Sequence, residues 1–151
     1  MNAEEGEVAL RPLDSSRFEE FWSLFQASLP ASAEETAALV GLTEERFRQL
    51  PHEVGELLQV ELGADVVGFV WLEVRARELH LHALLVRPGF RGQGLGGRAL
   101  AALVARYDDD VDAVELGVVP GNTAARRLYE RAGFTYVGER EGFLIMRRIL
   151  E

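Results

Sequence analysis

The sequence predicts a single α/β domain, a sandwich of helices around a central mixed β-sheet. Three observations lead to this prediction. The chain has 151 residues, 48% of them hydrophobic and 27% charged, which suits one ordinary globular domain. Segments with the periodicity of strands alternate with segments of helical periodicity, including a strand–helix–strand stretch near residues 78–118. No repeat or linker divides the chain, so we expect one domain over residues 1–151.

The first predicted elements are a short strand at 7–11 and a helix after it. Ser16 and Glu19 have the spacing of a capping box at the start of that helix. Large apolar side chains then recur at helical spacing, and Pro30 ends the helix. We interpret these side chains as packing residues of the core: Phe18, Phe21, Trp22, Phe25 and Leu29.

Two short helices and three strands are predicted next. Ser32 with Glu35 starts one helix, and Thr43–Leu50 forms another that ends before Pro51. The strands that follow are expected over residues 56–62, 66–75 and 78–86. The first two are joined as a hairpin.

The second half alternates helices and strands. We expect a helix over 94–107, a strand over 111–118 and a helix over 123–132, which Gly133 stops. The chain then ends in a hairpin of strands over 135–139 and 143–148.

Two missing residue types exclude several kinds of chemistry. The chain has no cysteine, which excludes disulfides, thiolate nucleophiles and cysteine-ligated zinc. It also has no lysine, since all 16 basic residues are arginine, which excludes Schiff-base chemistry and the P-loop. No apolar run approaches the roughly 18 residues of a membrane helix, and the N-terminus lacks a basic signal-peptide start. We therefore expect a soluble cytoplasmic protein with no membrane partner.

The net charge of −9 is unevenly distributed. Residues 1–63 hold four arginines and 13 acids, whereas residues 64–151 balance to zero. Residues 79–107 contain no acid, although four arginines lie there: Arg87, Arg91, Arg98 and Arg106. This window is where we expect a bound anion. Nucleic acid is disfavoured as a partner because the acidic surface would repel phosphate.

A glycine-rich turn lies between a predicted strand and a predicted helix. It reads Val86-Arg-Pro-Gly-Phe-Arg91-Gly-Gln-Gly-Leu-Gly-Gly97. Glycines let backbone N–H groups approach an oxyanion, and the helix N-terminus adds a positive dipole. The spacing also fits a dinucleotide fingerprint, but five residues separate the strand from Gly92, and the chain is too short for a second nucleotide-binding half. A nicotinamide-binding module is therefore rejected.

The turn resembles motif A of the GNAT N-acetyltransferase superfamily, Val-x-Pro-x-x-Arg-Gly-x-Gly-x-Gly before a helix. A second signature of that superfamily, Asn-x-x-Ala-x-x-Leu-Tyr-x-x-x-Gly-Phe, matches residues 122–134. The resemblance is specific over residues 78–148 and covers residues 1–75 in element order only. It implies a sheet of about seven strands with about four helices, whose fourth and fifth strands splay apart to admit acetyl-CoA as cosubstrate.

The resemblance also implies the residues that bind the cofactor. The backbones of Leu84, Leu85 and Val86 would pair with the pantetheine arm, and Asn122 would contact the cofactor near the thioester. The turn residues would hold the pyrophosphate: Arg91, Gly92, Gln93, Gly94, Leu95, Gly96 and Gly97. The backbone N–H of Leu85 or a neighbour would serve as the oxyanion donor, and the hydroxyl of Tyr129 would lie beside the CoA sulfur as the general acid.

The general base is left open between two residues and water. His80 and His82 alternate onto one face of their strand, and a histidine near its ordinary pKa could take the proton of the amine. The resemblance implies two positions for a glutamate base. In some members it lies on the fourth strand, where this chain has His82. In the branch that acetylates protein N-termini it lies five residues before the asparagine, where this chain has Gly117, so that base is missing. Glu73, on the preceding strand, is the next candidate. The histidine pair could also suggest a metal site, but the sequence shows no third ligand at a suitable spacing, so we expect no bound metal.

The leading hypothesis is therefore an acetyl-CoA-dependent amine N-acetyltransferase that works by direct transfer. The alternative is a non-catalytic acyl-CoA-binding sensor on the same fold. The resemblance places residues 14–50 along the acceptor side, and that segment lies in the acidic half, so we expect a cationic amine, small or peptidic, as acceptor. The acids concerned are Glu19, Glu20, Glu34, Glu35, Glu44 and Glu45. Homodimers are common in the superfamily, but no feature of the sequence fixes an interface.

Overall fold

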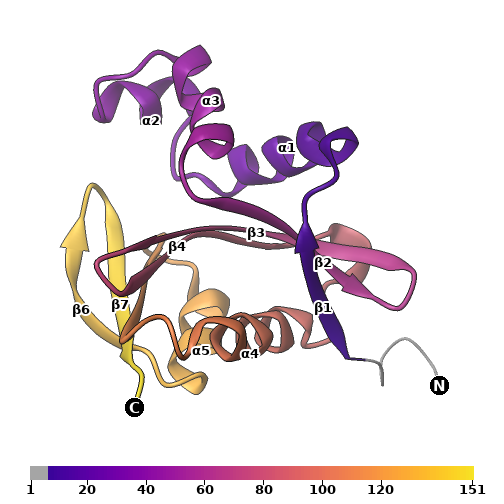
Figure 1. Cartoon of the computed structure of the whole chain (residues 1–151). Helices are drawn as coiled ribbons and strands as arrows, with labels where there is room; N and C mark the ends of the chain where they lie inside the picture. The colour runs from indigo at the N-terminus through magenta and orange to yellow at the C-terminus, as the bar shows by residue number, and fades with distance from the viewer. Residues whose placement is uncertain (1–6) are drawn as a thin grey trace.

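The computed structural model describes residues 7–151, which form a seven-stranded sheet with helices on both faces (Figure 1). The acidic residues 1–6, on which the expectation of no signal peptide rests, lie outside the described residues. The strands are β1 (Val8–Pro12), β2 (Glu56–Leu62), β3 (Asp65–Arg75), β4 (Glu78–Val86), β5 (Ala113–Val118), β6 (Thr135–Arg140) and β7 (Phe143–Ile149). Their order is β1-β2-β3-β4-β5-β7-β6, and only β4 and β5 pair in parallel. The predicted mixed sheet is confirmed.

Within the described residues five α-helices cover the sheet, the same five that the sequence predicts. One layer holds α1 (Phe18–Ser28), α2 (Ala33–Leu39) and α3 (Glu44–Glu53). The other layer, on the opposite face, holds α4 (Leu95–Tyr107) and α5 (Thr123–Arg131) (Figure 1). The helices and strands of the sequence prediction are all present, with bounds that differ by at most three residues.

The predicted start of α1 is wrong in detail. The segment Ser15–Arg17 is a 3₁₀ turn, and the side chain of Asp14, not that of Ser16, caps it by accepting a hydrogen bond of 3.0 Å from the N–H of Ser16. The tighter turn places Ser16 inside the element, so it cannot act as the cap of α1. The helix start predicted at Ser32 is confirmed, because Oγ of Ser32 accepts a 3.0 Å hydrogen bond from the N–H of Glu35.

The helix α3 does not end before Pro51 as predicted, since it continues to Glu53. Oγ1 of Thr43 caps its start by accepting a 3.1 Å hydrogen bond from the N–H of Arg46. Pro51 is buried in the last part of the helix, where its missing N–H removes a single intrahelical hydrogen bond. The helix tolerates that loss close to its end.

Two apolar cores lie on the two faces of the sheet. The core under α4 is mainly aliphatic and includes Leu100 and Leu103 of α4 together with Leu79 and Leu81 of β4. The core under α1 and α3 is aromatic and brings together four side chains of α1, one of α3 and two of β3: Phe18, Phe21, Trp22, Phe25, Phe47, Phe69 and Trp71. The aromatic residues of α1 are packing residues, as predicted.

A β-bulge interrupts the pairing of β3 with β4. Trp71 pairs with Ala83 and Leu72 pairs with Leu81, so His82 is an extra residue in β4. Before the bulge, Leu79 and Leu81 contribute to the core under α4, whereas after it Ala83 and Leu85 contribute to the core under α1. The bulge thus reverses which alternate side chains of β4 face each helical layer.

The strands β4 and β5 separate where β4 passes the bulge. Their parallel pairing runs from Glu78 with Ala113 to Leu81 with Leu116 and stops there, although β4 continues to Val86. The predicted splay of the fourth and fifth strands is therefore present, and it opens the sheet between the two helical layers.

Candidate active site

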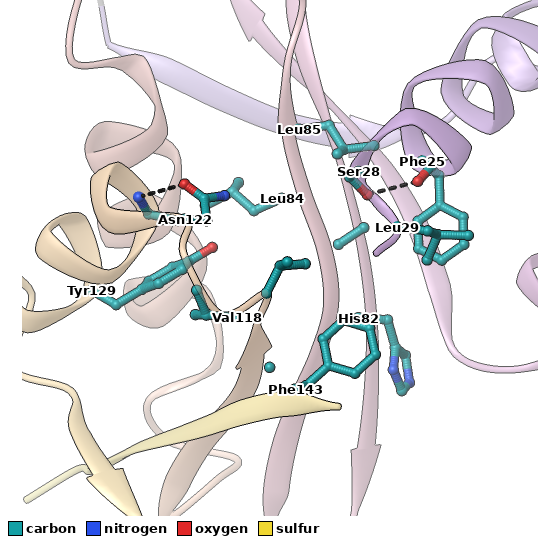
Figure 2. Close-up of a pocket in the computed structure, with 14 residues that line it drawn as sticks. Phe25, Ser28, Leu29, His82, Leu84, Leu85, Val118, Asn122, Tyr129 and Phe143 are labelled. Atoms are coloured by element: carbon teal, nitrogen blue, oxygen red, sulfur yellow. Dashed lines mark hydrogen bonds between the residues drawn. The ribbon is translucent and has the colours of Figure 1, made fainter. Parts of the chain in front are cut away.

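A cavity of about 180 Å³ lies between the separated ends of β4 and β5. Figure 2 shows Phe25, Ser28 and Leu29 on one side of it and Asn122 and Tyr129 of the α5 region on the other. Its lining comes from α1, β4, β5, α5 and β7: Phe25, Ser28, Leu29, His82, Ala83, Leu84, Leu85, Gly117, Val118, Val119, Asn122, Ala125, Tyr129 and Phe143. Five of the residues predicted for the site lie in this lining, namely His82, Leu84, Leu85, Asn122 and Tyr129.

The glycine-rich turn lines a second hollow beside this cavity. That hollow holds six of the predicted cofactor residues, together with Ala125 of the first cavity: Val86, Arg91, Gly92, Gly94, Leu95 and Gly96. Gly97 lines an adjoining hollow with Arg131 and Arg148, whereas Gln93 lines none of these hollows. The hollow at the turn therefore adjoins the cavity at Ala125 of α5.

The glycines of the turn serve different physical purposes. Gly92 and Gly94 have φ values of 79° and 74°, the left-handed region that glycine adopts without strain. A Cβ atom at either position would meet no heavy atom within 4 Å and would enter open space. Gly96 instead allows α4 and α5 to approach, since its Cβ would lie 3.1 Å from Cδ1 of Leu128. The first turn of α4 begins at Leu95 without a side-chain cap, which leaves its N–H groups for an anion.

The arginines of the acid-free window do not all serve an anion. Arg87 binds Glu20 at 2.6 Å and donates to the carbonyl of Val66. Arg106 donates to the carbonyl of Leu10 on β1. Arg91 remains at the hollow, where its Nε donates to the carbonyl of Val86 at 2.9 Å. Counting the arginines of residues 79–107 therefore predicts more cations at the turn than the structure places there.

Tyr129 is held by packing, with its hydroxyl toward the space between the strands (Figure 2). Its ring meets that of Phe134 edge-on at 5.7 Å between centroids. Burial raises the pKa of Tyr129 to about 12, so its hydroxyl keeps its proton at neutral pH. Asn122 precedes α5, and its Oδ1 accepts a 3.2 Å hydrogen bond from the N–H of Ala125. That bond fixes the start of the helix that carries Tyr129.

His82 and Glu73 form a pair at the other end of the cavity. Nε2 of His82 lies 3.3 Å from Oε1 of Glu73, and the imidazole lies against Trp71 with 4.7 Å between ring centroids. Burial lowers the pKa of His82 below the ordinary histidine value, and the neighbouring Glu73 partly offsets that shift. The imidazole is therefore neutral at pH 7 and able to accept a proton. Glu73 itself does not line the cavity.

Several lining residues were missed by the sequence analysis. Phe25 and Leu29 were assigned to packing alone, and Phe143 was given no role. Phe143 lies over Gly117, because a Cβ at Gly117 would come within 3.2 Å of the Cβ of Phe143. The absence of a side chain at Gly117 was the one signal in the sequence for this contact.

The acids expected along the acceptor side do not line the cavity. The wall that α1 presents consists of Phe25, Ser28 and Leu29, since the amphipathic helix turns its apolar face to the sheet. Glu19 pairs with Arg48, and Glu20 pairs with Arg17 and Arg87. The four glutamates of α2 and α3 are exposed on those helices: Glu34, Glu35, Glu44 and Glu45.

The described residues, 7–151, hold neither a cluster of metal ligands nor a membrane-spanning helix. No group of three or more histidine, aspartate or glutamate side chains there could hold a metal ion. None of the helices in that part of the chain is both long and apolar enough to cross a membrane.

Known sequences that resemble this chain are acetyltransferases. The model of the acetyltransferase (GNAT) family matches residues 17–134. A mycothiol acetyltransferase of Thermobispora bispora is 33% identical over 85% of this chain and 46% of its own length. An L-2,4-diaminobutyric acid acetyltransferase of Streptomyces avermitilis is 36% identical over 56% of this chain and 47% of its own. The chain thus spans less than half the length of these curated relatives.

A solved structure shares the fold. A GNAT family acetyltransferase of Elizabethkingia anophelis with acetyl-CoA bound superimposes with a TM-score of 0.71, at 14% sequence identity. The match covers 95% of this chain and 99% of the other.

Proposed function

Because the chain belongs to the acetyltransferase (GNAT) family, we propose that it transfers an acetyl group from acetyl-CoA directly to a primary amine. The observation that carries this proposal is the cavity between β4 and β5, with Tyr129 in one wall and His82 in another. A hollow suited to phosphates adjoins it, so a long cofactor and an acceptor could meet between the two helical layers.

The residues at the turn fit the diphosphate of acetyl-CoA. Gly92 and Gly94 leave open the space that side chains would fill, and Arg91 adds a cation at the same hollow. The β4 segment of Leu84, Leu85 and Val86 lies beyond the end of the β4–β5 pairing. Its edge has no strand partner on the β5 side and could pair with the amide groups of the pantetheine arm, where Arg91 already binds the carbonyl of Val86. When bound, acetyl-CoA supplies the thioester whose acetyl group is transferred.

The roles of the side chains follow from their protonation states. Neutral His82 would accept the proton that the ammonium of the acceptor must lose before the nitrogen can attack. With Nε2 donating to Glu73, Nδ1 is the nitrogen that accepts this proton. A backbone N–H at or near Leu85 would stabilise the oxyanion, and the protonated hydroxyl of Tyr129 would donate to the departing sulfur. Because the chain has no cysteine, an acetyl-cysteine route is closed.

The acceptor is proposed to be cationic. The support for this is the acidic half of the chain. Its exposed glutamates on α2 and α3 lie in the same helical layer as the α1 wall of the cavity. Since these acids do not line the cavity, they would act at long range, by attracting the amine toward the site.

The test is an amine panel in which thiol release from acetyl-CoA is recorded. The panel should include polyamines, aminoglycosides, amino acids and peptide N-termini. Release that depends on one class of amine would support the proposal. Acetyl-CoA binding by calorimetry without release for any amine would contradict it and favour an acyl-CoA-binding sensor instead.

A further inference from the structure

Charged side chains of both signs form a row across four strands on the face of the sheet that carries α1 to α3. Glu73 of β3 pairs in register with His80 of β4, His80 with Glu115 of β5, and Glu115 with Arg147 of β7. Residues paired in register share a face of the sheet, so the four side chains lie side by side. We call this row, together with Arg140 of β6, the polar floor.

The polar floor is accessible rather than part of a core. The side chains of its four register-paired members are between 13% and 29% exposed, and that of Arg140 is 63% exposed. The aromatic core under α1 and α3 includes residues of β3 and β4 but none of β5, β6 or β7. The floor therefore continues the sheet face beyond the region that the helices cover.

The floor leads directly into the cavity. Gly117 and His82, which line the cavity, each follow a floor residue by two positions on the same strand, a step of about 7 Å along that strand. The opposite face carries α4, α5 and the glycine-rich turn (Figure 1). An acceptor whose amine reaches the cavity from the α1 side would lay its remaining atoms on the polar floor.

The carboxylates of the floor already have cationic partners. The Glu115 side chain, 13% exposed, accepts from Arg140 at 3.3 Å and from Arg147 at 3.4 Å. Glu73 has the cation of Arg75 at 3.2 Å, and the neutral imidazole of His82 lies 3.3 Å from it. A second ammonium group on the acceptor would have to compete with these arginines, so the floor offers little to a simple polyamine.

The guanidinium of Arg140 can donate more hydrogen bonds than the one that it makes to Glu115. Its Nη1 binds Glu115, but a guanidinium carries five N–H donors and most of this one faces solvent. A two-residue turn with positive φ at Glu141 (52°) and Gly142 (86°) places Arg140 in register with Phe143, which lines the cavity. The turn holds the most exposed cation of the floor beside the wall of the cavity, in the fork geometry that carboxylates bind.

We propose that the polar floor binds the distal part of the acceptor and that Arg140 binds a carboxylate there. The acceptor is then an amine that also carries a carboxylate. Because the proposed acceptor has a net positive charge, it also carries a second ammonium group, which the floor does not bind, and this gives the diamino acid class. This inference rests on the proposed function, since it names the acceptor of that same site.

The experiment compares matched pairs of acceptors that differ only in the carboxylate. The pairs are 2,4-diaminobutyrate with 1,3-diaminopropane, ornithine with putrescine, and lysine with cadaverine. The kcat/KM for CoA release should favour one carboxylated member over its partner. Arg140→Gln should lower that preference about 10-fold to 100-fold, mainly through KM, the effect of a lost charge-assisted hydrogen bond. Arg46→Gln, which removes an equally simple ion pair on α3, serves as the control and should leave the preference unchanged.

Three results would overturn the inference. Equal kcat/KM within every pair in the unaltered protein would show that the carboxylate is not bound, while leaving the proposed function intact. An equal fall for both members in Arg140→Gln would assign Arg140 to structure alone. CoA release with none of these or other amines, with acetyl-CoA still bound, would reject the proposed function and the carboxylate site with it.

Discussion

The imidazole of His82 lies 3.3 Å from the carboxylate of Glu73, although the two residues do not pair in the β3–β4 ladder. The bulge makes this contact, because the extra residue in β4 brings His82 back toward β3 on the α1 side of the sheet. The histidine is thereby oriented by a partner that is outside the cavity, while its own ring lines the cavity.

Replacing His82 should slow turnover and change its pH dependence. His82→Ala removes the proposed base, so turnover should fall about 10²-fold to 10⁴-fold. In the unaltered protein the rate should decrease as pH falls below the lowered pKa of His82, because protonation blocks the base. A pH–rate profile measures this acidic limb, which His82→Ala should erase. Survival of the limb would place the base elsewhere.

Glu73→Gln should move the same limb without erasing it. Glu73 raises the pKa of His82 by its hydrogen bond and its charge, so its neutral replacement should lower that pKa further. The acidic limb should therefore shift to lower pH in the profile of kcat/KM. A limb that stays in place would mean that Glu73 does not act through His82.

Tyr129→Phe should reduce turnover and leave the affinity for acetyl-CoA nearly unchanged. The hydroxyl matters only as negative charge develops on sulfur, and a positioned acid typically contributes about 10²-fold to 10⁴-fold. The packing against Phe134 is kept, since only the oxygen is lost. Calorimetry and kcat together test this expectation, and full activity would assign Tyr129 to packing.

Gly94→Val should weaken acetyl-CoA binding while the fold persists. Gly94 has a φ of 74°, where a β-branched residue is strained by about 1–3 kcal/mol, and the new side chain would enter the phosphate hollow. Calorimetry should show a loss of about tenfold or more. Gly89→Val is the matched control, because Gly89 has open space around it and no positive φ. Equal affinities in both variants would defeat the placement of the phosphates.

Salt should lower kcat/KM for cationic acceptors. Attraction by the exposed glutamates of α2 and α3 is screened beyond about 8 Å at physiological ionic strength. A diamine or diamino acid should therefore outperform aspartate at low salt and lose part of that advantage as salt rises. Rates for the two kinds of acceptor that are equal and flat across salt would remove the charge argument.

The sequence predicted those parts of the site that lie within one continuous segment. The turn from Val86 to Gly97 and the segment from Asn122 to Phe134 each carry their geometry locally, so their residues could be named in advance. Gly117 showed that some group could lie over β5, but that this group is Phe143 depends on how β5 pairs with β7. The contacts of Arg87 with Glu20 and of Arg106 with Leu10 also could not be predicted, because each joins segments that are distant in the sequence. The start of α1 was wrong because two caps, Asp14 and Ser16, competed within three residues.

The bulge at His82 has a consequence for how proteins with this sheet can diversify. Because Trp71 pairs with Ala83 and Leu72 with Leu81, loss of His82 would restore a regular ladder and leave Ala83 and Leu85 on the α1 face. The cofactor edge of β4 would therefore keep its orientation. Substitution at His82 likewise alters only the acceptor side. New acceptor preferences can thus arise at this one position, by exchange or by loss of its side chain, without a change in the faces of the rest of β4.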